Sequence, residues 1–117
     1  ERMLAGYLNL AGVRPADLPL GRSTDYAPFL AAGVPVGGLT TGWSQRKTEV
    51  HARLWGGRAG APFDPNYHTA LDTIDNIDRH ALGIMAATVA FAVGNYAQSI
   101  EGVNGVPPRD QRNRRTP

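Results

Sequence analysis

The sequence predicts an α/β fold, specifically part of a mixed, mostly parallel β-sheet flanked by helices. Two observations support this prediction: a short apolar run bounded by glycine at residues 34–39, and helical periodicity in several other segments. The chain has 117 residues, of which 42% are hydrophobic and 19% charged, as is typical of a folded chain. One strand cannot make a sheet by itself, because a parallel strand pairs with neighbours. We therefore expect residues upstream of Glu1 to complete the sheet.

The first half of the chain predicts two helices followed by the strand. Residues 2–11 form the first helix, and Gly12 follows where a left-handed residue ends a helix. Five apolar residues give this helix one buried side: Met3, Leu4, Tyr7, Leu8 and Ala11. A second, short helix is expected to be capped by residues 23–25 and to run through Ala32. Residues 34–39 then form a buried strand.

The second half predicts a short helix at residues 48–55, an irregular loop, and a long helix from Arg79 to about Ser99 that is capped by Asp78. Five residues form the apolar stripe of the long helix: Leu82, Met85, Val89, Ala92 and Tyr96. Residues after Glu101 have no apolar periodicity. We therefore divide the chain into a folded portion, residues 1–101, and a disordered basic tail, residues 102–117.

Charge and composition exclude several classes of protein. The net charge of +2 comes from four arginines in the tail: Arg109, Arg112, Arg114 and Arg115. Without them and Asp110, 8 basic and 9 acidic residues remain, so the body of the chain carries no basic face for nucleic acid. No apolar run reaches the ~18 residues of a membrane span, so we expect none in this chain. The absence of cysteine excludes disulfides and thiolate metal sites.

The densest cluster of reactive side chains lies between Asp64 and Asp72, and contains the adjacent pair Tyr67 and His68. Imidazole is a common zinc ligand, and a phenol can donate a hydrogen bond to an oxyanion. The spacing by itself is weak evidence, because a surface histidine beside capping carboxylates has the same pattern. His51 and His80 lack facing partners at a metal-binding interval and are expected to be solvated or capping residues.

Two stretches carry a more specific signal: GRSTDYAPFLAAGVPVGGLTTG at residues 21–42 and LWGGRAGAPFDPNYHTALDTIDNI at residues 54–77. In this order and separation they closely resemble the C-terminal part of the catalytic domain of secreted bacterial two-zinc aminopeptidases. The resemblance extends over roughly residues 1–99. It implies a zinc-exopeptidase fold, a metallopeptidase activity, and a location outside the cytoplasm, either secreted or in the cell envelope.

The resemblance also implies roles for individual residues. His68 corresponds to a zinc ligand, and Tyr67 to the residue that hydrogen-bonds the tetrahedral intermediate. Arg22, with Gly21, corresponds to residues that line the cleft and help to hold the substrate or product carboxyl end, a task that suits a guanidinium fork. Thr40 occupies a position where the family usually has an aromatic residue that walls the pocket for the first side chain. We therefore expect a wider or more polar pocket here.

The sequence departs from the family pattern at several other positions. Thr24 is an extra residue in the GRS-DY motif, and it could shift the neighbouring arginine. Asn66 and Leu71 replace cysteines that brace the Tyr-His loop in many relatives. Gly83 and Ala87 replace acidic residues that bind calcium in some relatives, so we expect no calcium site.

The family mechanism uses two zinc ions and a glutamate general base to remove N-terminal residues from peptides that have a free α-amine. The other zinc ligands and the base precede this segment in the family, so the chain alone is expected to be inactive and to need the upstream part of the same domain. The leading hypothesis is a zinc-dependent aminopeptidase. A non-catalytic binding or structural module with the same fold is the alternative, and another zinc hydrolase with this fold is a third possibility.

Overall fold

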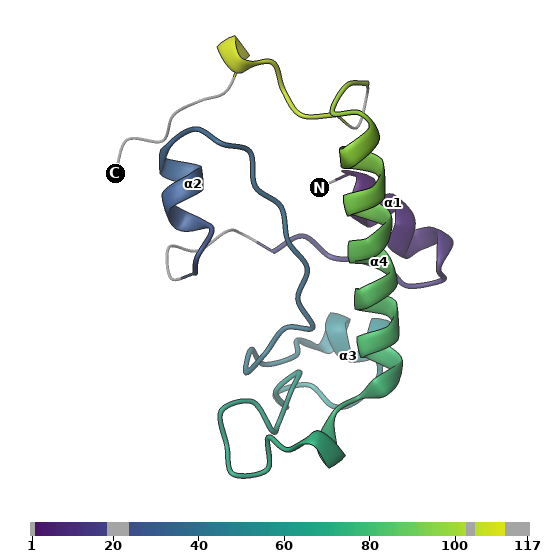
Figure 1. The fold of residues 1–117 in the computed structure, drawn as a ribbon. Helices are drawn as coiled ribbons and strands as arrows, with labels where there is room; N and C mark the ends of the chain where they lie inside the picture. Colours follow the sequence, from purple (N-terminus) through teal and green to yellow (C-terminus); the bar gives the residue numbers. More distant parts are fainter. Residues whose placement is uncertain (1, 19–23, 103–104, 112–117) are drawn as a thin grey trace. The chain divides into compact units, whose positions relative to one another are not determined.

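The computed structural model describes residues 2–18, 24–102 and 105–111, and it divides the chain into two compact units. Unit 1 consists of Glu1–Gly38 and Thr88–Pro117, and unit 2 consists of Leu39–Ala87. The described residues form four α-helices and two short 3₁₀ helices (Figure 1): α1 Arg2–Leu10, α2 Ala27–Ala31, α3 Glu49–Trp55, η1 Ile74–Asn76, α4 Arg79–Gln98 and η2 Arg109–Gln111.

Helix α1 confirms the first predicted helix and its glycine end. Gly12 has a φ of 78°, and its amide donates to the Asn9 carbonyl at 3.1 Å, while the Val13 amide donates to the Leu8 carbonyl at 2.8 Å. This pair of hydrogen bonds is a Schellman motif, which satisfies carbonyls at the end of the helix. Four of the five residues predicted for the buried side of α1 are covered: Leu8 is only 6% exposed, and Met3, Leu4 and Tyr7 are half-buried. The fifth, Ala11, is exposed.

Helix α2 confirms the second predicted helix but not its cap. Its N-cap residue is Tyr26, and no side chain in the described part of the chain caps the helix amides. The Ala27 amide instead donates to the Thr24 carbonyl at 3.0 Å, so a backbone turn begins the helix. Ser23, one of the expected capping residues, lies outside the described residues. The helix ends at Ala31, and Gly33, with a φ of 75°, follows its C-cap as the left-handed residue.

The predicted strand at residues 34–39 is not formed within the described chain. The described residues contain one isolated antiparallel bridge, between Arg46 and Pro62, and no β-strand. A parallel strand needs neighbouring strands to satisfy its backbone, and the described segments offer residues 34–39 no such partner. The α/β fold class therefore stays a prediction about the complete domain.

Helix α4 confirms the long helix and its cap. The Asp78 Oδ1 atom accepts hydrogen bonds from the amides of His80 and Ala81, both at 3.0 Å. The predicted apolar stripe is only partly covered within the described chain, because Leu82 is 54% exposed and Val89 is 51% exposed. The better covered side consists of residues that recur at helical spacing: Ala81, Ile84, Met85, Thr88, Ala92 and Tyr96.

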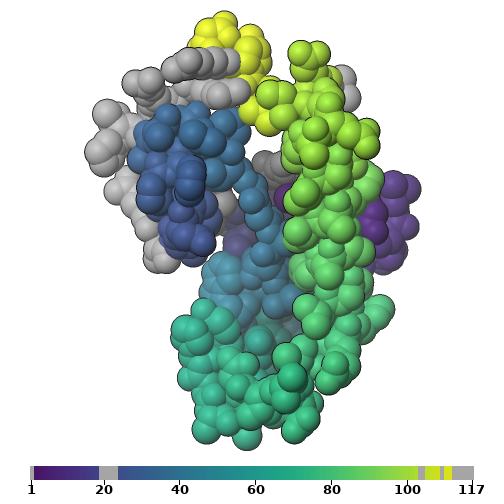
Figure 2. All heavy atoms as spheres, in the orientation of Figure 1, coloured from purple at the N-terminus to yellow at the C-terminus, as the bar shows by residue number. Residues whose placement is uncertain are grey.

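A second side of α4 is also apolar and lies exposed. In Figure 2 atoms of α4, in green, are seen on the viewed face. Leu82, Val89 and Val93 of this helix are 54%, 51% and 63% exposed. By length and composition alone the helix is apolar enough to cross a membrane, with a mean hydropathy of 1.3, but the core helix of a soluble protein meets the same criterion. The expectation that this chain has no membrane span stays a prediction.

The chain buries little of its surface. Its accessible area is 9214 Å², whereas a folded monomer of 12.5 kDa exposes about 6,200 Å² by the usual size scaling. Among the described residues, Leu8 and Thr88 are the only buried ones. Every other apolar side chain of the described residues is thus at least partly exposed. The predicted boundary after residue 101 stays untested, because residues 103–104 and 112–117 lie outside the described chain.

Candidate functional site

Unit 2 contains a short antiparallel backbone pairing between residues 43–47 and residues 60–64, which we call the ladder. Four backbone hydrogen bonds of 2.8 Å hold it: Asp64 to Trp43, Phe63 to Gln45, Lys47 to Ala61 and Gly60 to Lys47, donor first. The two segments of an antiparallel pair run in opposite directions, so the start of one lies beside the end of the other. Here Trp43, which begins the first segment, is paired with Asp64, which ends the second. The ladder therefore brings the loop that carries Thr40 and the loop that carries Tyr67 and His68 to one end.

Phe63 anchors the ladder against the Gly42 backbone and α3. A β-carbon added at Gly42 would lie 2.6 Å from the Phe63 ring, and Gly42 has a φ of 99°, so only glycine fits there without strain. The Phe63 ring centroid lies 5.4 Å from that of His51 and 5.7 Å from that of Trp55. Lys47 Nζ lies 5.6 Å from the same ring. This aromatic cluster gives unit 2 a local core.

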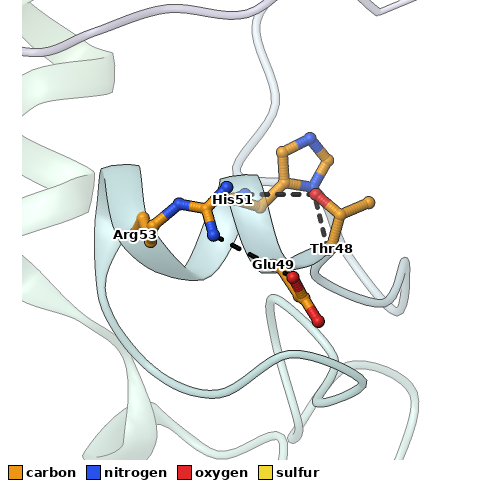
Figure 3. Close-up of polar contacts among 4 residues, drawn as sticks. All are labelled: Thr48, Glu49, His51 and Arg53. Carbon is orange, nitrogen blue, oxygen red and sulfur yellow. Dashed lines mark hydrogen bonds and ion pairs between the residues drawn. The ribbon is translucent and has the colours of Figure 1, made fainter.

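Helix α3 begins with a capping box in which a histidine takes the usual place of glutamate (Figure 3). The His51 amide donates to Thr48 Oγ1 at 3.1 Å, and the Thr48 amide donates to His51 Nδ1 at 3.3 Å. The expected capping role of His51 is thus confirmed. Glu49 and Arg53 form an exposed pair at 3.9 Å, which contributes little to stability.

The loop after the ladder presents Tyr67 and His68. The Asp64 Oδ1 atom accepts from the Asn66 amide at 2.8 Å, and Thr69 Oγ1 donates to the Asn66 carbonyl at 2.8 Å. The rings of Tyr67 and His68 are stacked, with centroids 4.0 Å apart and an angle of 11° between their planes. His68 has a φ of 56°, which is uncommon outside glycine and is often found at functional sites. Both side chains are exposed.

The donor set available to a metal is a single imidazole. No group of three or more metal-ligating side chains is present among the described residues. His68 therefore fits a zinc site only as one ligand, because zinc requires three or four. The other ligands must come from outside the described part of the chain.

Of the other predicted site residues, Thr40 is described and Gly21 and Arg22 are not. Thr40 Oγ1 accepts from the Gly42 amide at 3.0 Å, so its hydroxyl is bonded within its own loop. Gly21 and Arg22 lie outside the described residues. Sequence reasoning missed the ladder and, with it, the position of Trp43 at the same end as His68. The available signal was an aromatic residue three positions after Thr40.

Residues 11–93 match the model of peptidase family M28, and this range includes all the predicted site residues. The match identifies the chain as part of a peptidase. The chain belongs to peptidase family M28, which confirms the family that its motifs suggested.

The relatives are named as aminopeptidases. The chain is 50% identical over 114 residues to a probable lipoprotein aminopeptidase LpqL of Mycobacterium tuberculosis, covering 97% of this chain and 23% of that protein. It is 46% identical over 90 residues to a probable leucine aminopeptidase 2 of Aspergillus fumigatus, covering 77% and 17%. It is 42% identical over 92 residues to a leucine aminopeptidase 2 of Arthroderma otae, covering 79% and 18%. The chain thus spans about a fifth of the length of the curated relatives it matches.

Proposed function

We propose that the complete protein is a zinc-dependent aminopeptidase, and that this chain is one piece of its catalytic domain. The observation that carries this proposal is the exposed, stacked pair of Tyr67 and His68 on a loop that the ladder holds in place. Within the described chain the exposed imidazole of His68 stacks on the Tyr67 ring and makes no hydrogen bond or ion pair. A nitrogen left open in this way suits a metal ligand. The names of the relatives support the same activity.

His68 would hold zinc through one imidazole nitrogen, together with ligands outside this chain. Zinc at a two-metal site supplies a Lewis acid for the scissile carbonyl and a water that is easily deprotonated. The task of His68 is to fix one coordination position. Asp64 supports this task indirectly, because its carboxylate holds the Asn66 amide and so shapes the loop.

Tyr67 would donate a hydrogen bond from its phenol to the oxyanion that forms when the carbonyl carbon becomes tetrahedral. Such a donor is most effective where the charge develops, and it must be in place before the reaction. Tyr67 is 39% exposed, so its hydroxyl is accessible to a substrate. We further propose that Arg22 and Gly21 help to hold the carboxyl end of the substrate or product, and that Thr40 contributes to the pocket for the first side chain.

The partners follow from the same proposal. The substrates would be peptides with a free N-terminus, and the rest of the catalytic domain would cover the exposed apolar residues of α4. Leu82, Val89 and Val93 lie at helical spacing on that uncovered side and are 54%, 51% and 63% exposed. The relative named as a lipoprotein supports a location in the cell envelope, with secretion as the other extracytoplasmic location.

The test uses the complete protein that contains this chain. We expect hydrolysis of leucine p-nitroanilide, loss of that hydrolysis on treatment with a chelator, and its return with added zinc. N-acetyl-leucine p-nitroanilide should not be cut, because the free amine is part of the recognised substrate. Equal hydrolysis of the blocked substrate would favour another type of zinc hydrolase, and no hydrolysis of either would favour the non-catalytic module.

A further inference from the structure

Trp43 is a large aromatic residue held in an unusual backbone conformation beside the candidate site. Its φ is 37°, a value that is rare for a bulky side chain and persists only where the surroundings determine it. It is 37% exposed. Within the described part of the chain, its indole has no ring contact and no hydrogen bond. More than a third of this large side chain is therefore open to solvent, and no ring stack or hydrogen bond within the described chain occupies it.

The ladder fixes where Trp43 lies. Its carbonyl accepts from the Asp64 amide at 2.8 Å, and the preceding residue, Gly42, is pressed against the Phe63 ring. Tyr67 lies three residues beyond Asp64 in sequence. Even a fully extended chain would place their backbones at most ~10 Å apart. The Trp43 backbone is thus close to the end of the ladder from which the tyrosine-histidine loop leaves.

Thr40, the other candidate for the pocket wall, is a poor apolar surface. Its side chain is small, and its hydroxyl is bonded to the Gly42 amide at 3.0 Å. An indole offers a large apolar face. A leucine or phenylalanine side chain buries more apolar area against such a face than alanine does, so its binding free energy is more favourable. Of the two residues, Trp43 has the side chain that can discriminate between substrates.

We propose that Trp43 is a specificity-determining residue whose indole contacts the first side chain of the peptide substrate. The proposal rests on the aminopeptidase function proposed above. It gives the enzyme a preference for large apolar or aromatic N-terminal residues, although the position usually occupied by an aromatic wall carries Thr40.

The experiment measures kcat/KM of the complete zinc-loaded enzyme on leucine, phenylalanine and alanine p-nitroanilides. Trp43→Ala should lower the value about 10-fold for leucine and phenylalanine, and by less than about 3-fold for alanine. Trp43→Phe should retain most of the preference. Val50→Ala is the control, because Val50 is an apolar residue of α3 in the same unit and is 52% exposed; it should leave all three values unchanged.

Other results would overturn the proposal. An equal fall on all three substrates, or a lower melting temperature with unchanged selectivity, would show that Trp43 only packs against the rest of the domain. If Trp43→Ala does not fold, Trp43→Phe and Trp43→Leu are used in its place. A change of selectivity between these two variants would support the proposal, and identical selectivity to the wild type in both would overturn it. A wild-type enzyme that cuts none of the substrates would refute the aminopeptidase function itself, whereas an active enzyme with unchanged selectivity would refute only the role of Trp43.

Discussion

Tyr67 and His68 share a stacked geometry but have separate chemical tasks in the proposed site. The centroid distance of 4.0 Å places the rings in contact, so either ring restricts the other. The imidazole can then offer one fixed nitrogen to a metal while the phenol donates a hydrogen bond to an oxyanion. Substitutions that keep the stack but remove one polar atom separate these tasks.

Tyr67→Phe removes only the hydroxyl group. In the complete enzyme we expect kcat to fall by roughly 10²-fold with little change in KM, because the lost hydrogen bond forms mainly in the tetrahedral intermediate. Zinc content should stay the same. Tyr7→Phe is a matched control, since Tyr7 stacks on Phe91 in unit 1 and its ring would be kept. Near-normal turnover of Tyr67→Phe would remove the assigned role.

Gly42→Ala tests the close contact that holds the ladder. The added β-carbon would lie 2.6 Å from the Phe63 ring, and alanine is strained at a φ of 99°. We expect amide hydrogen exchange at Phe63 and Asp64 to become about 10-fold faster or more, corresponding to ~1.4 kcal/mol of local stability. Gly38→Ala is the control, because nothing lies within 4 Å of its added carbon. Unchanged exchange at both amides would show that the contact is dispensable.

At the scale of elements, the sequence predicted the helices well, but it did not predict the backbone pairing between segments that are distant along the chain. Asp78, Thr48 and Gly12 mark helix ends through bonds to nearby backbone, so each could be recognised from its neighbours. The ladder gives no such signal, because it is short, contains Gly60 and Pro62, and lacks alternating apolar residues. The strand at residues 34–39 depends on partners that local sequence does not supply.

The same contrast applies to the candidate site. Motifs identified Tyr67 and His68, which follow one another in sequence. They could not identify Trp43, because its proximity to that loop depends on a hydrogen bond to Asp64, 21 positions away along the chain. The left-handed backbone of His68 was also missed, since a histidine adopts it only when the surrounding turn imposes it.

The cap of α3 provides a prediction at the same scale. Thr48→Ala removes the hydroxyl that accepts from the His51 amide at 3.1 Å, and the loss of such a cap costs ~1 kcal/mol. We expect exchange of the His51 amide to become about 5-fold faster, with the aromatic cluster retained. Thr41→Ala, at an exposed threonine in the same unit, should have no effect on that amide. Equal exchange rates in both variants would contradict the capping box.

For the whole molecule, two observations have a common explanation. The chain exposes 9214 Å² and leaves apolar residues of α4 uncovered, and it spans only 17–23% of the first relatives it matches. The proposal that this chain is one piece of a larger catalytic domain accounts for both observations. His68 is thus expected to act only together with residues that lie outside this chain.

The most direct test of this account is the zinc content of the complete protein with His68→Ala, compared with the wild type and with His80→Ala. His80 is an exposed histidine at the start of α4, so it serves as the matched control. Elemental analysis of the dialysed proteins should show that His68→Ala loses about one zinc ion per molecule and that its aminopeptidase activity falls at least 100-fold. His80→Ala should match the wild type. Full zinc content and near-normal hydrolysis in His68→Ala would contradict the central claim that this loop carries a zinc ligand.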